Sequence, residues 1–188
     1  MQAYLGIATL VAFVILVLIR ARALKKEGID AIEFGNKDRK DFLLIPFVVF
    51  YFYHITAHAF HLPILGGQEL FYFKAVNYLG SIMCLIALVF FVWTLLSFKK
   101  SFRVGLMDNR EQGLVTTGAF SISRNPIYVC FILMLVGQFL IFPNVIMLLY
   151  VLAGSLRINK QVLKEEHFLT DQYGEAYLVY RKNVRRYL

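Results

Sequence analysis

Five strongly apolar segments, separated by basic and polar connections, constrain this chain more than any other feature of its sequence. A helix needs about 20 mostly apolar residues to cross a bilayer, and only helices or closed barrels satisfy their backbone polar groups there. Hydrophobic residues make up 59% of the 188 residues, well above the roughly 45–50% of soluble domains. We therefore predict an all-α integral membrane protein with five transmembrane segments. These segments are residues 4–19, ended by Arg20, and residues 42–61, 74–98, 126–142 and 145–154.

The basic residues fall on alternate connections and predict the orientation of the chain. Nineteen of the 20 Lys and Arg residues lie in residues 20–40, 99–124 and 157–186. Cytoplasmic connections of membrane proteins carry such an excess of positive charge. This pattern places these three segments in the cytosol, and Met1 with the later turns outside. Because the charges flank apolar blocks, the net charge of +8 fits a membrane surface and argues against nucleic acid as a partner.

Pro143 and Asn144 mark a tight reversal between the last two apolar segments. As a helix, residues 126–142 would reach about 25 Å, short of a hydrocarbon core of about 30 Å. The sequence therefore predicts a helical hairpin whose first limb does not fully cross the bilayer.

The stretch Gln112–Tyr128, QGLVTTGAFSISRNPIY, ends in a helix-start signal at the membrane surface. Asn125 is a favourable N-cap residue, and Pro126 suits the first helical position. The unpaired N–H groups of such a helix start attract anions, and Arg124 adds a fork of donors beside it. This pattern predicts an anion-binding corner. The alternative is that Arg124, Asn125 and Tyr128 serve only as interfacial anchor, cap and aromatic belt residue.

The segment after the last apolar block reads as a helix that leaves the membrane. Arg157, Gln161 and Glu165 are spaced four residues apart and so share one face of this helix. Glu166 is assigned to a solvated face, and Gly174 is expected to end the helix. Residues 175–188 form a second, amphipathic stretch, which is expected to rest on the headgroups. The tyrosines expected to contact headgroups are Tyr173, Tyr177 and Tyr180.

Three motifs in order resemble the isoprenylcysteine carboxyl methyltransferase family, in its short five-helix prokaryotic form. They are SFRVGL at 101–106, GLVTTGAFSISRNPIY at 113–128 and, after the hairpin, EE followed by GEAYLVYRKNVRR. The resemblance covers roughly residues 80–188. It implies an S-adenosylmethionine-dependent methyltransferase with a cytosolic cofactor site and a lipophilic substrate that enters from the bilayer. Residues 1–188 are then one membrane domain, in which 1–75 add spans and 76–188 form the methyltransferase-like core.

The resemblance, together with the anion-binding corner, gives a set of candidate cofactor-binding residues. These residues are Gln112, Gly113, Leu114, Val115, Phe120, Arg124, Asn125, Pro126, Ile127, Tyr128 and Glu165. The resemblance also implies that Arg157 and Gln161 position the substrate. The implied acceptor is the carboxylate of an isoprenylcysteine-like or other lipid, and the implied partners are that substrate and the membrane lipids.

Two positions depart from the family pattern. The motif Arg-His-Pro reads Arg124, Asn125, Pro126 here, and an asparagine can still cap and donate hydrogen bonds. Gln161 stands where the eukaryotic enzymes place a substrate-binding arginine, with Arg157 one turn away as a possible replacement. The second departure puts isoprenylcysteine itself in question and leaves membrane methyl transfer intact.

Other interpretations stay open at this stage. His54, His58 and His61 share one helix face at a spacing that suits metal ligation, although neutral histidines hydrogen-bonded between helices are the expected case and no metal is predicted. Cys84 and Cys130 are expected to be packing residues. An NADPH-dependent membrane reductase of the sterol-reductase type, or a non-catalytic lipid-binding protein, are the alternative functions.

Overall fold

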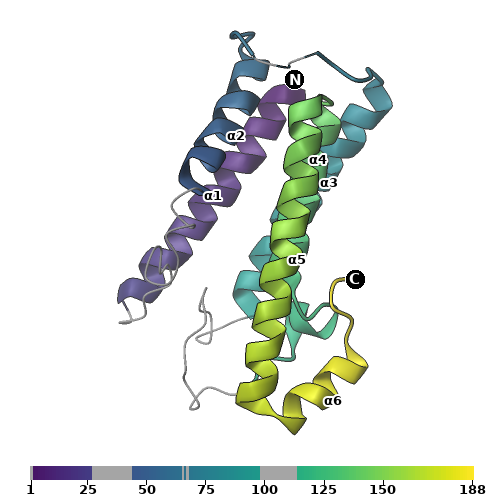
Figure 1. The fold of residues 1–188 in the computed structure, drawn as a ribbon. Helices are drawn as coiled ribbons and strands as arrows, with labels where there is room; N and C mark the ends of the chain where they lie inside the picture. Colours follow the sequence, from purple (N-terminus) through teal and green to yellow (C-terminus); the bar gives the residue numbers. More distant parts are fainter. Residues whose placement is uncertain (1, 27–43, 65, 67, 98–113) are drawn as a thin grey trace.

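The computed structural model describes residues 2–26, 44–64, 66, 68–97 and 114–188. The regular secondary structure of these residues is helical, as predicted, with six α-helices and one 3-10 helix (Figure 1). Their bounds are α1 Gln2–Lys26, α2 Leu44–Ala59, α3 Lys74–Ser97, η3 Gly118–Ser121, α4 Pro126–Ile141, α5 Val145–Tyr173 and α6 Glu175–Asn183. Much of the two polar connections predicted before α2 and after α3 lies outside the described residues.

Three helices are long and apolar enough to cross a bilayer, which is compatible with an integral membrane protein. They are α1 over Gln2–Arg22, α3 and α5. The helices α2 and α4 have 16 residues each, which corresponds to about 24 Å. The helix α1 itself continues to Lys26, beyond Arg20, where the sequence predicts the end of the first apolar segment. A long basic side chain can extend toward the polar boundary without interrupting the backbone hydrogen bonds of its helix.

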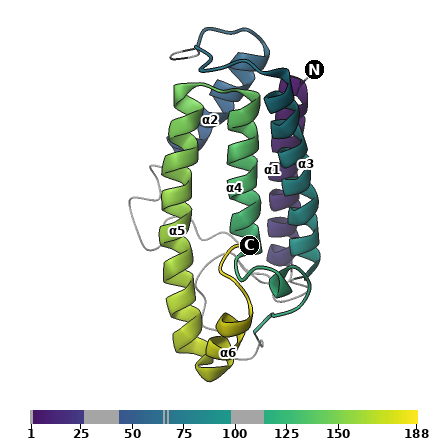
Figure 2. The ribbon, with the colours of Figure 1, turned by 90° about the vertical axis from the view of Figure 1, so that its right-hand side faces the viewer.

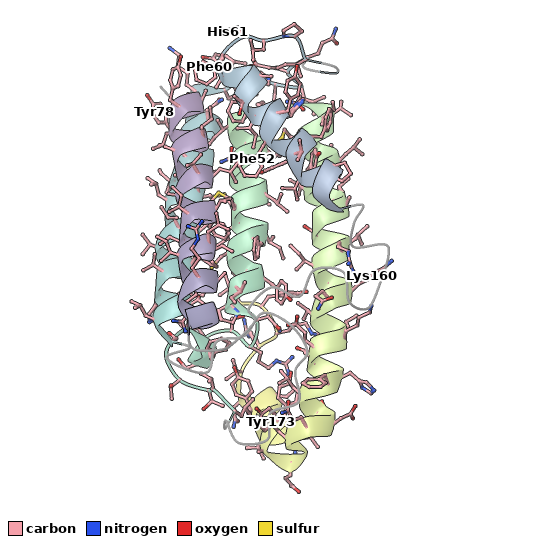
Figure 3. The ribbon with its side chains drawn as sticks, turned by 90° about the vertical axis from the view of Figure 1, so that its left-hand side faces the viewer. Phe52, Phe60, His61, Tyr78, Lys160 and Tyr173 are labelled. Carbon is pink, nitrogen blue, oxygen red and sulfur yellow. The ribbon has the colours of Figure 1, made fainter. Side chains whose placement is uncertain are left out.

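The chain connections gather at two ends of the helical bundle. At one, the turn end, the connection from α2 to α3 meets the α4–α5 turn, where the Leu70 N–H donates to the Pro143 carbonyl at 2.6 Å. At the other, the site end, lie η3, the start of α4 and α6 (Figure 1). Phe60 and His61 mark the turn end and Tyr173 the site end (Figure 3). The turns predicted at Pro63 and Pro143 to face one side thus lie together, and the membrane side that each end faces stays a prediction.

The helices α3 and α4 pack against each other along most of their length. A Cβ atom at Gly80 would lie 2.6 Å from the Gly137 carbonyl oxygen, and one at Gly137 would lie 2.7 Å from Cys84 Sγ. Small residues at a membrane helix interface permit this close approach of two backbones. Cys84 and Cys130 are both buried free thiols, which agrees with their predicted packing role.

Asn144 holds the turn end together at the start of α5. Its Oδ1 accepts a hydrogen bond from the Met147 N–H at 2.9 Å, which caps the helix, and lies 3.1 Å from His54 Nε2. Its Nδ2 donates to the Phe142 carbonyl at 3.2 Å. Since Oδ1 is an acceptor, His54 carries its proton on Nε2 in this contact. The predicted reversal at Pro143 is therefore confirmed, and one histidine is hydrogen-bonded between helices as expected.

The longest described helix, α5, has 29 residues and so reaches about 43 Å. It ends at Gly174, as predicted, where a φ of 52° suits glycine. After α6 the chain turns back, and its C-terminus lies beside the start of α4 (Figure 2). The prediction that Tyr177 and Tyr180 rest on headgroups is wrong, because they are only 1% and 7% exposed. The Tyr180 hydroxyl donates to the Phe120 carbonyl at 2.7 Å, so this face of α6 packs inward.

Candidate functional site

The start of α4 lies where the sequence predicts it, but its cap differs. Asn125 occupies the N-cap position and Pro126 follows at the first turn, yet the Asn125 side chain makes no capping hydrogen bond. Its Nδ2 donates instead to Glu166 Oε1 at 3.3 Å and to the Arg186 carbonyl at 3.1 Å. The predicted capping role is therefore wrong, because a buried carboxylate and a carbonyl of the C-terminal tail compete successfully for this amide.

Glu166 is the centre of a buried ionic cluster at this point. Only 5% of the residue is exposed. Its Oε1 lies 3.1 Å from Arg124 Nη2, and its Oε2 lies 2.9 Å from Arg186 Nη2 and 3.0 Å from Arg186 Nε. The assignment of Glu166 to a solvated face is wrong, since two arginines from other segments offset the cost of burying its charge. The hydrogen bond to Glu166 raises the pKa of Arg186, so the guanidinium of Arg186 stays charged.

Arg124 retains hydrogen-bonding capacity inside this cluster. Its side chain is 7% exposed, so it is not the interfacial anchor of the alternative reading. Its Nη2 pairs with Glu166, whereas its Nε and Nη1 are buried and have no partner among the described residues. Buried donors without a partner cost free energy unless a ligand or water satisfies them. Two guanidinium donors beside a helix start are therefore available for an anion.

A second cluster joins the first turn of α4 to the middle of α5. The Tyr128 hydroxyl donates to Glu165 Oε1 at 2.5 Å, and Gln161 Nε2 donates to the same oxygen at 3.0 Å. Arg157, one turn before Gln161 on α5, is exposed. The predicted residues of α4 and α5 thus converge, because adjacent positions 165 and 166 direct their carboxylates into neighbouring clusters.

The loop before α4 contacts both α3 and α6 next to these clusters. Residues 118–121 form the 3-10 helix η3. The Ala119 N–H donates to Ser97 Oγ at 3.0 Å, which ties η3 to the end of α3. Phe120 is 8% exposed and is held by α6 through the contact described above. Leu114 and Val115 precede η3 and are partly buried, and the candidate residues Gln112 and Gly113 lie outside the described residues.

The C-terminal tail supplies partners that the sequence did not reveal. Arg186 contacts Glu166, and the Tyr187 hydroxyl donates to Asn159 Oδ1 on α5 at 2.9 Å. The Ser123 Oγ–H donates to the Arg186 carbonyl at 3.3 Å. No spacing rule relates a tail to a loop 60 residues earlier, so the only sequence signal was a basic pair at the end of an amphipathic stretch.

The histidines of α2 lie at the turn end and form no part of this site. His54 is fully buried and bonded to Asn144, and its ring centroid lies 6.2 Å from that of His58. His61 is exposed and has a φ of 55°. Among the residues that the structure describes, no group of three or more histidine, cysteine or acidic side chains is arranged to hold a metal ion.

Comparison with known proteins adds one finding to this geometry. A sequence model of the family described as "Phospholipid methyltransferase" matches residues 76–176. A search of curated proteins gave no match. The matched region runs from α3 to the start of α6 and contains the start of α4 together with Glu165 and Glu166. The tail residues 185–187 follow the matched region.

Proposed function

The chain belongs to the phospholipid methyltransferase family, and from this premise we propose that it transfers a methyl group from S-adenosylmethionine to a lipophilic acceptor in the bilayer. Family membership implies a membrane methyltransferase. The cofactor, the acceptor and the residues that bind them are the proposal. The observation that carries it is the convergence of the α4 start, through Tyr128, on Glu165 of α5.

The chemistry of the described residues fits S-adenosylmethionine. Its carboxylate requires donors, which Arg124 Nε and Nη1 and the first-turn N–H groups of α4 can supply. Its ammonium and ribose hydroxyls require an acceptor, which the Glu165 carboxylate can supply. When bound, this cofactor supplies an electrophilic methyl group. The chain then has to orient the acceptor and exclude water, without the need for a metal or a covalent intermediate.

The acceptor is the least constrained part of the proposal. Gln161 is neutral, and its amide donates to Glu165, so it supports the proposed cofactor contact and provides no charge for an acceptor carboxylate. Arg157 is the nearby cation on the same helix face. Binding of an acceptor carboxylate therefore depends on the positive charge of Arg157. This holds for an isoprenylcysteine-like compound and for any other lipid with a carboxylate. Methyl incorporation into fractionated lipid extracts from radiolabelled S-adenosylmethionine would identify the acceptor class.

Titration calorimetry of the detergent-purified protein tests the function itself. Heat of binding with S-adenosylmethionine and none with NADPH is the expected result. Heat with NADPH only would replace the proposal by a membrane reductase. The absence of heat with both compounds would support a non-catalytic lipid-binding protein.

Glu165→Gln is expected to weaken S-adenosylmethionine binding by about tenfold or more, because a hydrogen bond to a charged group is lost where water cannot replace it. Calorimetry measures the change. Glu175→Gln removes the same charge from an exposed position on α6 and is the matched control. Equal affinity for the Glu165→Gln variant and the original chain would contradict the assignment of Glu165 to the cofactor site.

The proposed orientation places the site end and the C-terminus in the cytoplasm and the turn end outside, with five membrane segments. Cysteine labelling tests it cleanly, because Cys84 and Cys130 are buried. Leu62 lies at the turn end and Leu188 at the site end of the bundle, and they are 47% and 61% exposed. Leu62→Cys should react with a membrane-impermeant thiol reagent in intact cells, and Leu188→Cys only after permeabilisation. The reverse pattern would invert the orientation.

A further inference from the structure

We infer that residues 185–187 form a C-terminal clasp that positions the start of α4, with Glu166 as its anchor. This inference rests on the proposed function, because the start of α4 is where we place the cofactor carboxylate. It goes beyond the family comparison, since the matched region ends at residue 176. In this assignment Glu166 and Arg186 are positioning residues.

The clasp binds the loop before α4 mainly through its backbone. The Arg185 carbonyl accepts a hydrogen bond from the Arg124 N–H at 2.9 Å, and residues 123 and 185 form an isolated parallel bridge. The Arg186 carbonyl accepts from the side chains of Ser123 at 3.3 Å and Asn125 at 3.1 Å. The three consecutive residues before Pro126 are therefore each bonded to the tail.

Side chains fasten the same tail to α5 at two points. Arg186 Nε and Nη2 both contact Glu166 Oε2, and the Tyr187 hydroxyl donates to Asn159 at 2.9 Å. Glu166 also contacts Arg124 and Asn125 through Oε1. One carboxylate thus joins α5, the loop before α4 and the tail, and the clasp fixes the distance between the α4 start and α5.

This arrangement separates positioning from folding. The α3–α4 interface is built from small residues such as Gly80 and Gly137, and none of the tail contacts involves it. Release of the tail would leave these helices packed. It would free the backbone of Arg124 and the amide of Asn125, whose placement relative to Glu165 determines whether one ligand can touch both helices.

The test compares Arg186→Ala with Lys182→Ala in the full-length protein. Both remove one positive charge, but Lys182 is exposed on α6 and takes no part in the clasp. Arg186→Ala should weaken S-adenosylmethionine binding by about tenfold, Arg186→Lys should restore part of it, and Lys182→Ala should leave it unchanged. Tyr187→Phe, which removes the contact with Asn159, should weaken binding in the same direction with a smaller effect.

Two further measurements exclude a merely structural role. The thermal midpoint in detergent should change little in Arg186→Ala, whereas hydrogen exchange at the Arg124 N–H should become faster without any cofactor present. An affinity loss that parallels a fall in the thermal midpoint, or unchanged exchange at Arg124, would overturn the clasp. If the original chain does not bind S-adenosylmethionine, the proposed function fails, and the exchange measurement alone still decides whether the clasp exists.

Discussion

Glu166→Leu is expected to lower the free energy of unfolding by about 3–5 kcal/mol, the usual cost of leaving a buried charge without its partner. Glu166 and Arg124 have side chains that are 6% and 7% exposed. Two nitrogens of Arg124 already lack a partner within the described part of the chain, so the substitution would leave its guanidinium without a compensating carboxylate. Arg186 is 34% exposed and can turn toward water. Unfolding in mixed micelles with increasing denaturing detergent measures the loss.

The double variant Arg124→Leu/Glu166→Leu provides the control for this mechanism. It removes both buried charges, and replacement of a buried pair by apolar residues is often close to neutral. We expect it to recover most of the lost stability while binding S-adenosylmethionine poorly, since the proposed carboxylate donors are gone. A double variant as unstable as Glu166→Leu alone would show that the carboxylate stabilises the fold through contacts other than Arg124.

The apolar helices could be predicted from the sequence because each depends on local composition. The five apolar segments and the start signal at Pro126 correspond to observed helices, whose first residues match the prediction for three helices and differ by two residues for the other two. Local hydrogen bonding and apolar length determine such elements. The exception is the end of α1, because a charge within an apolar pattern does not stop a helix by itself.

The ionic cluster could not be predicted, because it depends on segments distant in sequence. Glu165 and Glu166 are identical in type and adjacent, and only the position of α5 decides which one meets Tyr128 and which one meets the arginines. A resemblance to a family singled out Glu165. Glu166 is buried against Arg186 as well as Arg124, and nothing in the sequence placed Arg186 near α4.

The same reason explains the incorrect expectations for Asn125 and Tyr180. An asparagine before a helix and a tyrosine on an amphipathic stretch both have common local roles, capping and headgroup contact. The chain reverses direction after Gly174, and this reversal brings the tail and α6 into contact with the loop before α4. Hydrogen bonds to these distant segments then replace the local roles of both side chains. Both replacements occur at the candidate site.

Gly80→Ala is expected to destabilise the protein by about 1–3 kcal/mol, the typical cost of overpacking a tight interface. The added Cβ would lie 2.6 Å from the Gly137 carbonyl oxygen and 3.0 Å from the Ile141 nitrogen. Both are backbone atoms of α4 and cannot move aside as a flexible side chain could, so the helices must separate. The end of α3 holds η3 through Ser97, so separation should also displace the loop before α4 and weaken cofactor binding.

Gly154→Ala is the matched control, because it makes the same change within α5 against a different neighbour. Its Cβ would meet only the side chain of Leu135, with Cδ1 at 2.7 Å, and this terminal methyl group can rotate away. Alanine is also favoured over glycine in a helix by about 1 kcal/mol. We therefore expect Gly154→Ala to be neutral or stabilising in a detergent unfolding assay. Equal destabilisation by both substitutions would contradict a close α3–α4 contact, because the effect would then follow from glycine replacement alone and not from the rigidity of the opposing backbone.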